Sequence, residues 1–152
     1  QIDPVAMRKD ADPTDFDAES TEGRTIWYSP EGKLTNFADH EKGELVYSVS
    51  YVDGKPALEI RKDPRDKSRE SQIIYDEHGQ VLMEIEETGK GVKTVACRSN
   101  GSKLAETFTP KGGEISHKWW TAAGKETDQE SVIGELLTLE KRVRNRMDAI
   151  SN

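Results

Sequence analysis

The side chains best able to do chemistry are few and scattered. The chain has three histidines and one cysteine, at His40, His78, His117 and Cys97. No pair of them has the short spacing typical of zinc ligands, and no histidine lies near the cysteine in sequence. A nucleophile elbow, a phosphate-binding glycine loop and a dinucleotide fingerprint are also missing from the sequence. We therefore predict that the protein is not an enzyme and has no catalytic residue, metal site or cofactor.

Two further patterns resemble functional motifs but have simpler explanations. The segment from Asp15 to Glu19 carries carboxylates at alternate positions, as a calcium loop does, but Ser20 and Ile26 stand where such a loop needs glycine and glutamate. The sequence Asn100-Gly101-Ser102 matches the N-glycosylation pattern, and Asn-Gly is also the strongest signal for a two-residue type I′ hairpin turn. We interpret the first as part of a solvated acidic tail and the second as a turn.

Composition and charge restrict the fold and the partners. The chain has 152 residues, of which 33% are hydrophobic and 34% charged, which fits one domain built on a sheet with one wet face. The net charge of -7 opposes the negative field of nucleic acid and of anionic membranes. No apolar run approaches the length of about 20 residues that spans a bilayer. We expect a protein partner, no nucleic acid and no membrane insertion.

The cysteine content and the first residue bear on location. A single cysteine cannot form an intramolecular disulfide, so it does not identify the compartment. The sequence starts with Gln1 instead of methionine, which fits either signal cleavage or an excised fragment. We expect an extracytoplasmic protein, periplasmic or secreted, and leave open whether Gln1 is a processed terminus.

Glycines recur about every eleven residues between short segments rich in β-formers. This spacing is typical of a β-meander. Apolar residues alternate with polar ones in most segments, as in Leu45–Val52, so that one face is consistently more apolar. The pattern predicts a mainly β fold, a sequential antiparallel meander of about nine strands forming an open, curved single sheet or half-barrel, with turns at Gly32, Gly54, Gly79 and Gly101. The expected strands are 24–29, 33–39, 44–52, 56–62, 71–76, 80–87, 92–98, 102–109 and 114–121.

The sequence divides into three parts. Residues 1–22 are expected to be a flexible acidic N-terminal segment, residues 23–126 the β-meander repeat domain, and residues 127–152 a C-terminal amphipathic helix. Thr127 and Glu130 match a capping box at the start of this helix. Its apolar seam, which predicts packing on the sheet or self-association as a coiled coil, consists of Val132, Leu136, Leu139, Val143 and Ile150, widened by Ile133, Leu137 and Met147.

Aromatic residues are the best candidates for partner contacts. Adjacent residues of a strand point to opposite faces, so at most one of Trp119 and Trp120 can lie in the main core, and the same holds for Trp27 and Tyr28. Tyrosine and tryptophan rings on a solvent-exposed face are well suited to bind a partner, because each has an apolar ring and a polar group. The predicted partner-binding residues are Trp27, Tyr28, Tyr47, Tyr51, Trp119 and Trp120.

The turn segments also resemble a known family. Tyr28–Leu34, Tyr51–Pro56 and Tyr75–Leu82 share an aromatic residue, two or three polar residues, glycine, then lysine or glutamine. Arg98–Leu104 and Thr121–Lys125 are similar but lack the tyrosine. This pattern resembles the hairpin repeats of bacterial MORN-variant and YD-like proteins over about residues 24–126. The resemblance implies an extended antiparallel sheet used for binding, often in secreted or envelope proteins, and implies no catalytic residue.

The sequence is compatible with three functions. The first is a non-catalytic protein-interaction module that presents an extended β surface, because hairpin repeats extend a surface with contacts only between neighbours. The second is an up-and-down barrel or half-barrel that binds a small apolar ligand. The third is an enzyme of unrecognised class. A homo-oligomer through the C-terminal helix is a further possibility, and the partner's identity is beyond the sequence.

Overall fold

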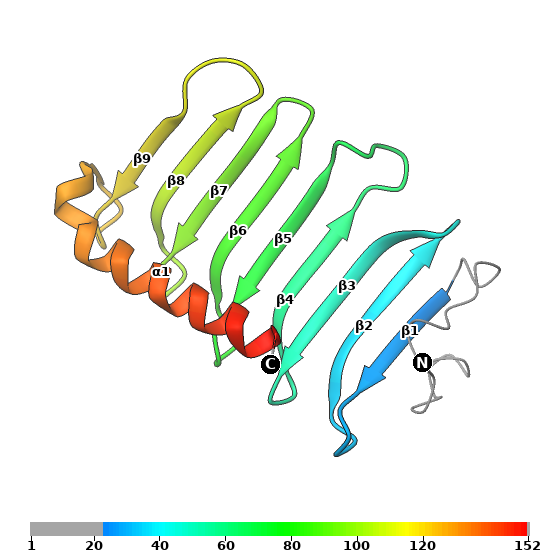
Figure 1. The fold of residues 1–152 in the computed structure, drawn as a ribbon. Helices are drawn as coiled ribbons and strands as arrows, with labels where there is room; N and C mark the ends of the chain where they lie inside the picture. The colour runs from blue at the N-terminus through cyan, green and yellow to red at the C-terminus, as the bar shows by residue number, and fades with distance from the viewer. Residues whose placement is uncertain (1–22, 152) are drawn as a thin grey trace.

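The computed structural model describes residues 23–151, as one sheet and one helix (Figure 1). The predicted flexible segment 1–22 lies outside these residues. Every strand pairs antiparallel with its neighbours in sequence, in the order β1 to β10. The predicted sequential meander followed by a helix is confirmed. The elements are β1 (Gly23–Tyr28), β2 (Leu34–Glu41), β3 (Glu44–Val52), β4 (Lys55–Lys62), β5 (Glu70–Tyr75), β6 (Val81–Thr88), β7 (Gly91–Cys97), β8 (Lys103–Pro110), β9 (Ser116–Trp120), β10 (Glu126–Thr127) and α1 (Gln129–Ser151).

The sheet is open. Its two outermost strands, β1 and β10, lie at opposite edges and do not pair with each other (Figure 1). Of the predicted forms, the open single sheet is therefore the one observed. The described strands enclose no barrel interior, so an apolar ligand cannot be held in the way that the barrel hypothesis requires.

The start of the helix differs from the sequence prediction. Residues Glu126 and Thr127 form the two-residue strand β10 against β9, so there are ten described strands where about nine were predicted. The helix cap is Asp128, whose carboxylate accepts from the backbone amide of Ser131 at 3.0 Å. The predicted capping box centred on Thr127 is wrong, because the next residue is an aspartate, which caps at least as well and frees the threonine for strand pairing.

Four turns at one end of the sheet share a hydrogen-bond pattern. In each, the first residue's amide donates to the fifth residue's carbonyl, and a glycine amide at the fourth position donates back to the first residue's carbonyl. Gly101 has a φ of 88°, which glycine adopts at no steric cost. Asn100 has no positive φ, so the predicted type I′ turn is wrong in type although the turn is where it was expected. The four turns are Ser29–Lys33, Asp76–Gln80, Arg98–Ser102 and Thr121–Lys125.

In three hairpins, β3–β4, β5–β6 and β7–β8, one extra residue beside the turn adds to the core. The pairing register shifts by one residue, so that Ala57, Leu82 and Leu104 have no partner across the strand pair. These are among the most buried side chains, with 0%, 0% and 2% of their surface exposed. A bulge redirects the strand, so adjacent residues such as Leu82 and Met83 can both pack in the core. The shifts therefore give a single-layer sheet a thicker apolar layer where the helix lies.

Helix α1 packs on the sheet of its own chain and crosses the ends of most strands (Figure 1). All five predicted seam residues belong to the core or pack against it, with Val132 and Leu139 buried. Met147 also packs there, whereas Ile133 and Leu137 are exposed. Self-association of this helix as a coiled coil stays a prediction. It would use the same seam side chains that pack on the sheet in this structure.

Three arginine contacts fix the helix at the ends of the strands. Each joins a helix residue to a residue at or beside a turn, and in each the guanidinium donates to an oxygen. Asp76 is almost fully buried, and it also accepts from the amides of its own turn. The contacts are Arg98 Nε to Glu135 Oε2 (2.7 Å), Arg142 Nη2 to Asp76 Oδ2 (3.3 Å) and Arg146 Nε to the carbonyl of Tyr75 (3.0 Å).

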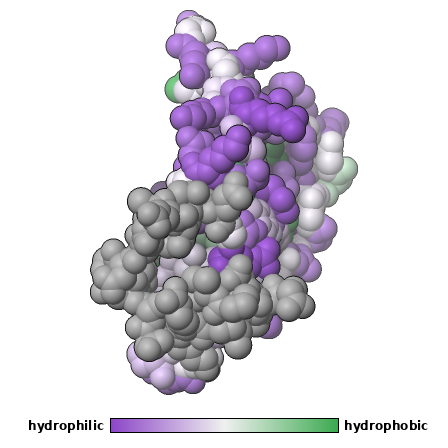
Figure 2. Space-filling view, turned by 90° about the vertical axis from the view of Figure 1, so that its right-hand side faces the viewer, coloured by the Kyte–Doolittle hydropathy of each residue, from purple (hydrophilic) through white to green (hydrophobic). Residues whose placement is uncertain are grey.

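The visible surface agrees with the polar composition. Figure 2, which views the molecule from the β1 side, shows mainly hydrophilic residues outside the grey atoms, with only small hydrophobic patches. In the part of the chain that the structure describes, no helix is long and apolar enough to cross a membrane.

Candidate partner-binding surface

The face of the sheet opposite α1 carries the densest group of aromatic side chains. Phe37, Val49 and Glu59 lie side by side on this face, as the strand register shows. Within residues 23–151 no other element packs on it, and we call it the open face. Val49 is nevertheless only 5% exposed, so neighbouring side chains must cover it. The open face therefore has a small apolar layer of its own.

A hydrogen-bonded cluster holds this layer in place. Glu59 accepts from the hydroxyl groups of Tyr47 and Tyr75, the second at 2.8 Å, and from Arg61 at 3.2 Å. These residues come from three neighbouring strands, β3, β4 and β5. We call Tyr47, Glu59, Arg61 and Tyr75 the tyrosine–glutamate cluster. Because both phenols share one carboxylate, their rings are fixed relative to the sheet.

Phe37 extends the cluster toward β1. Its ring centroid lies 5.5 Å from that of Tyr47 and 6.3 Å from that of Tyr51, in tilted arrangements that aromatic pairs favour. The guanidinium of Arg24 lies over Phe37, 4.3 Å from the centroid, and also donates to Asp39 at 2.7 and 2.9 Å. The rings therefore lie between two ion pairs, Arg24 with Asp39 and Arg61 with Glu59. The result is a rigid surface that offers both apolar ring faces and polar groups.

The electrostatics of the cluster favour neutral tyrosines and an ionised glutamate. Burial, followed by the hydrogen bond to Glu59, raises the pKa of Tyr47 and of Tyr75 to about 12. Burial also acts to raise the pKa of Glu59, but the hydrogen bonds from the two tyrosines and the contacts with Arg61 outweigh it, so the pKa is lowered. The phenols therefore stay protonated donors at neutral pH. This is a positioning network and contains no activated nucleophile or general base.

The structure brings only two of the six predicted contact residues together. Tyr47 and Tyr51 lie in the aromatic layer of the open face. Strand alternation puts Tyr28 on the same face, in β1 at the edge of the sheet, and Trp120 on that face in β9, where the amine of Lys103 lies 5.3 Å from its ring.

The other two tryptophans lie on the face that α1 partly covers. The register of Trp27 with Asn36 places it on this face at the β1 edge. Trp119 packs against the core and stacks with His117, with ring centroids 5.6 Å apart. The predicted set of six is therefore split between two faces. That result follows the alternation rule, which already separates each adjacent aromatic pair.

The sequence prediction missed five residues of this surface. They are not conspicuous in sequence, because none is a tryptophan or part of an adjacent aromatic pair, and their contacts are made across strand pairs, so they depend on the register. Of these residues Tyr75 was the easiest to predict, because it precedes a polar turn that contains glycine, as Tyr51 does. The missed residues are Arg24, Phe37, Glu59, Arg61 and Tyr75.

An apolar hollow lies on the other face, between α1 and the sheet. It has a volume of about 480 Å³ and is lined by Met83, Trp119, Leu136 and other apolar side chains. The exposed helix residues Ile133 and Leu137 form its outer side. Polar side chains also line it, namely Thr94, Thr107, His117, Gln129 and Glu140.

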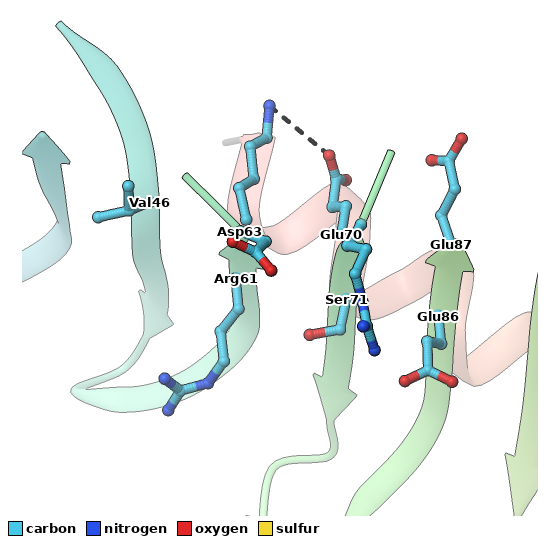
Figure 3. Close-up of a pocket in the computed structure, with 9 residues that line it drawn as sticks. Val46, Arg61, Asp63, Glu70, Ser71, Glu86 and Glu87 are labelled. Atoms are coloured by element: carbon cyan, nitrogen blue, oxygen red, sulfur yellow. Dashed lines mark ion pairs between the residues drawn. The ribbon is translucent and has the colours of Figure 1, made fainter. Parts of the chain in front are cut away.

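A charged hollow of about 310 Å³ lies at the opposite strand ends, beside the 63–69 loop (Figure 3). Figure 3 shows Glu70 and Glu87 pointing to one side of the sheet, whereas Arg61 and Glu86 point to the other. Lys62 pairs with Glu70 at 3.6 Å. Because these side chains diverge, they do not form a site that could hold one reacting group.

The histidines and the cysteine do not form a reacting group in the described residues. His78 is an exposed turn residue, and His117 contacts Thr107 at 3.2 Å on β9. Burial, with a contribution from the Glu84 carboxylate, raises the pKa of the Cys97 thiol and disfavours the thiolate. No three histidine, cysteine, aspartate or glutamate residues between positions 23 and 151 gather in a way that would hold a metal ion.

Comparison of the sequence with models of known protein families gives no match, and comparison with curated proteins finds no significant relative.

Proposed function

We propose that the protein is a non-catalytic interaction module that binds a protein partner through the open face. The observation that carries this proposal is the fixed aromatic layer on a face that no described element covers. Rigid aromatic and arginine side chains with partial burial are the residue types that dominate binding energy at interfaces. Here Arg24 lies over Phe37, Tyr47 donates to Glu59, and Tyr51 packs against Phe37, so little conformational entropy would be lost on binding.

The resemblance to MORN-variant and YD-like hairpin repeats is part of the same proposal. The shared hydrogen-bond pattern of the four turns supports it, as does the extra core residue beside two of them, Leu82 and Leu104. An extracytoplasmic location stays a prediction.

Site-specific photo-crosslinking in the native host tests the proposal. A photoreactive residue would replace Tyr51 on the open face, and Ile115 would be the matched control, since it is 53% exposed and lies in the β8–β9 connection. We expect one protein adduct that forms strongly from position 51 and weakly from position 115. Equal labelling at both positions, or none at position 51, would contradict the use of the open face.

Binding of a small apolar ligand is a second candidate, supported by the hollow beside Trp119. Its volume of about 480 Å³ lies within the usual range of ligand pockets, roughly 300–1,000 Å³. Titration with an apolar fluorescent probe would test it, with Trp119→Phe to identify tryptophan quenching at this site. Saturable quenching that Trp119→Phe removes would favour the ligand function, and its absence would leave the protein-binding proposal alone.

A further inference from the structure

One tyrosine from each of three alternate strands lies in a row across the open face. Tyr28, Tyr51 and Tyr75 stand at or next to the last position of β1, β3 and β5, 23 and 24 residues apart in sequence. All three are partly buried. The hydroxyl of Tyr75 donates to Glu59 at 2.8 Å, and the ring of Tyr51 lies 6.3 Å from that of Phe37. The row therefore presents rings in fixed positions, one for each hairpin.

The spacing of this row matches the repeat of a polyproline II helix. Neighbouring strands lie about 4.7–4.9 Å apart, so residues on alternate strands lie about 9.4–9.8 Å apart across the sheet. A polyproline II helix rises about 3.1 Å per residue, so every third residue returns to the same side after about 9.3 Å. A β-strand laid in the same direction does not match, because its side chains return to one side every two residues, after about 6.6–6.8 Å.

An exposed carboxylate lies next to the row, on β6. Glu84 stands on the open face between Ile73 of β5 and Val95 of β7, which are both apolar. Within residues 23–151 it forms no ion pair. The lysine of the neighbouring strand, Lys93, stands opposite Glu86 instead. The open face thus offers a negative charge that a basic residue of a partner would complement.

We propose that the partner segment on the open face is a proline-rich chain in the polyproline II conformation, with an arginine or lysine near one end. Prolines three residues apart pack against Tyr51 and Tyr75, and the segment crosses the strands at right angles. Glu84 lies one strand, or about 4.8 Å, beyond Tyr75, which places the basic residue one or two positions beyond the second proline. The inference rests on the proposed function, because it names the kind of partner that this face binds.

Titration of the full chain with synthetic peptides tests the proposal by calorimetry. One peptide has ten prolines followed by two arginines, and we expect it to bind at least about fivefold more tightly than ten prolines followed by two glutamates. Tyr51→Ala should weaken binding of the arginine peptide at least about tenfold, and Glu84→Gln about threefold. Glu87→Gln is the matched control, because it changes an exposed carboxylate of the same strand that points to the other side of the sheet (Figure 3). It should leave the affinity unchanged.

A flexible peptide separates conformation from charge. Ten alternating glycines and serines followed by two arginines should bind at least about tenfold more weakly than the proline peptide, and equal binding would overturn the polyproline II assignment. Binding that Tyr51→Ala leaves intact, once circular dichroism shows that the variant is folded, would assign the peptide to another surface. If no proline peptide binds although crosslinking from position 51 captures a partner, the inference is wrong and the proposed function stands. Failure of both experiments contradicts both.

Discussion

Replacement of Arg98 by alanine tests how a single-layer sheet holds its helix. The Arg98 side chain is only 9% exposed, and it donates to Glu135 on α1 through Nε at 2.7 Å and through Nη2 at 3.1 Å. It also donates to the carbonyls of Lys103 at 2.7 Å, Trp120 at 2.8 Å and Thr121 at 3.3 Å. One guanidinium thus joins β7, β8, β9 and the helix.

The loss in the free energy of unfolding depends on which hydrogen-bond partners of Arg98 remain shielded from water after the side chain is removed. Hydrogen bonds to charged groups contribute about 1.5–3 kcal/mol each when they are shielded from water. Removal of Arg98 lets water reach some of the carbonyls, so we expect a loss of about 3 kcal/mol in the free energy of unfolding. Glu135 is half exposed, and Glu135→Gln should therefore cost less than about 1 kcal/mol. Arg98→Lys should fall between them, because an ammonium group cannot bridge the helix and the carbonyls at once.

Urea denaturation followed by circular dichroism and tryptophan fluorescence measures these differences. The double variant with both changes should cost little more than Arg98→Ala alone, since the arginine makes both sets of contacts. If Glu135→Gln costs as much as Arg98→Ala, the ion pair stabilises the junction, which contradicts the larger contribution expected from the carbonyl contacts.

Further predictions concern the helix seam, the strand turns and the open face. Leu139→Asp should unfold the domain cooperatively, whereas Leu137→Asp, at a site 60% exposed, should change the melting temperature little. Gly91→Ala should lose about 1–3 kcal/mol or more, because its Cβ would lie 2.3 Å from a backbone oxygen, whereas Gly89→Ala meets only a side-chain atom at 3.6 Å. The two tyrosines that donate to Glu59 have a folded pKa of about 12, above the unfolded value near 10, so their stabilisation should be complete below pH 10 and be lost as the pH rises toward 12. Glu59→Ala should lower their ultraviolet titration midpoints part of the way toward 10, since burial is the larger cause.

The strand order and the helix could be predicted from sequence because both depend on local patterns. Alternation and regularly spaced glycines define neighbouring strands when the connections are short. Apolar residues spaced four and three positions apart, from Val132 to Val143, define one face of a helix. The cap was missed for a local reason, since two good capping residues stand next to each other at Thr127 and Asp128.

The core and the candidate surface were harder to predict because they depend on register. Strict alternation cannot place both Leu82 and Met83 in the core, and only the shift in pairing shows that it happens. In the same way, Tyr47 and Tyr75 meet at Glu59 only after three strands are aligned. A sequence pattern that ranks aromatic residues individually finds Tyr47 but not the carboxylate that fixes it.

The central claim is that the open face binds a protein partner, and the most direct measurement is the affinity of that partner for Tyr51→Ala. The partner captured by crosslinking would be titrated with the unmodified chain, with Tyr51→Ala and with Ile115→Ala, after circular dichroism shows that all three are folded. We predict that Tyr51→Ala weakens binding by about 30-fold, as expected for loss of an interface anchor worth about 2 kcal/mol, and that Ile115→Ala changes it less than about twofold. Equal affinities for the two variants would contradict the assignment of the open face as the contact surface.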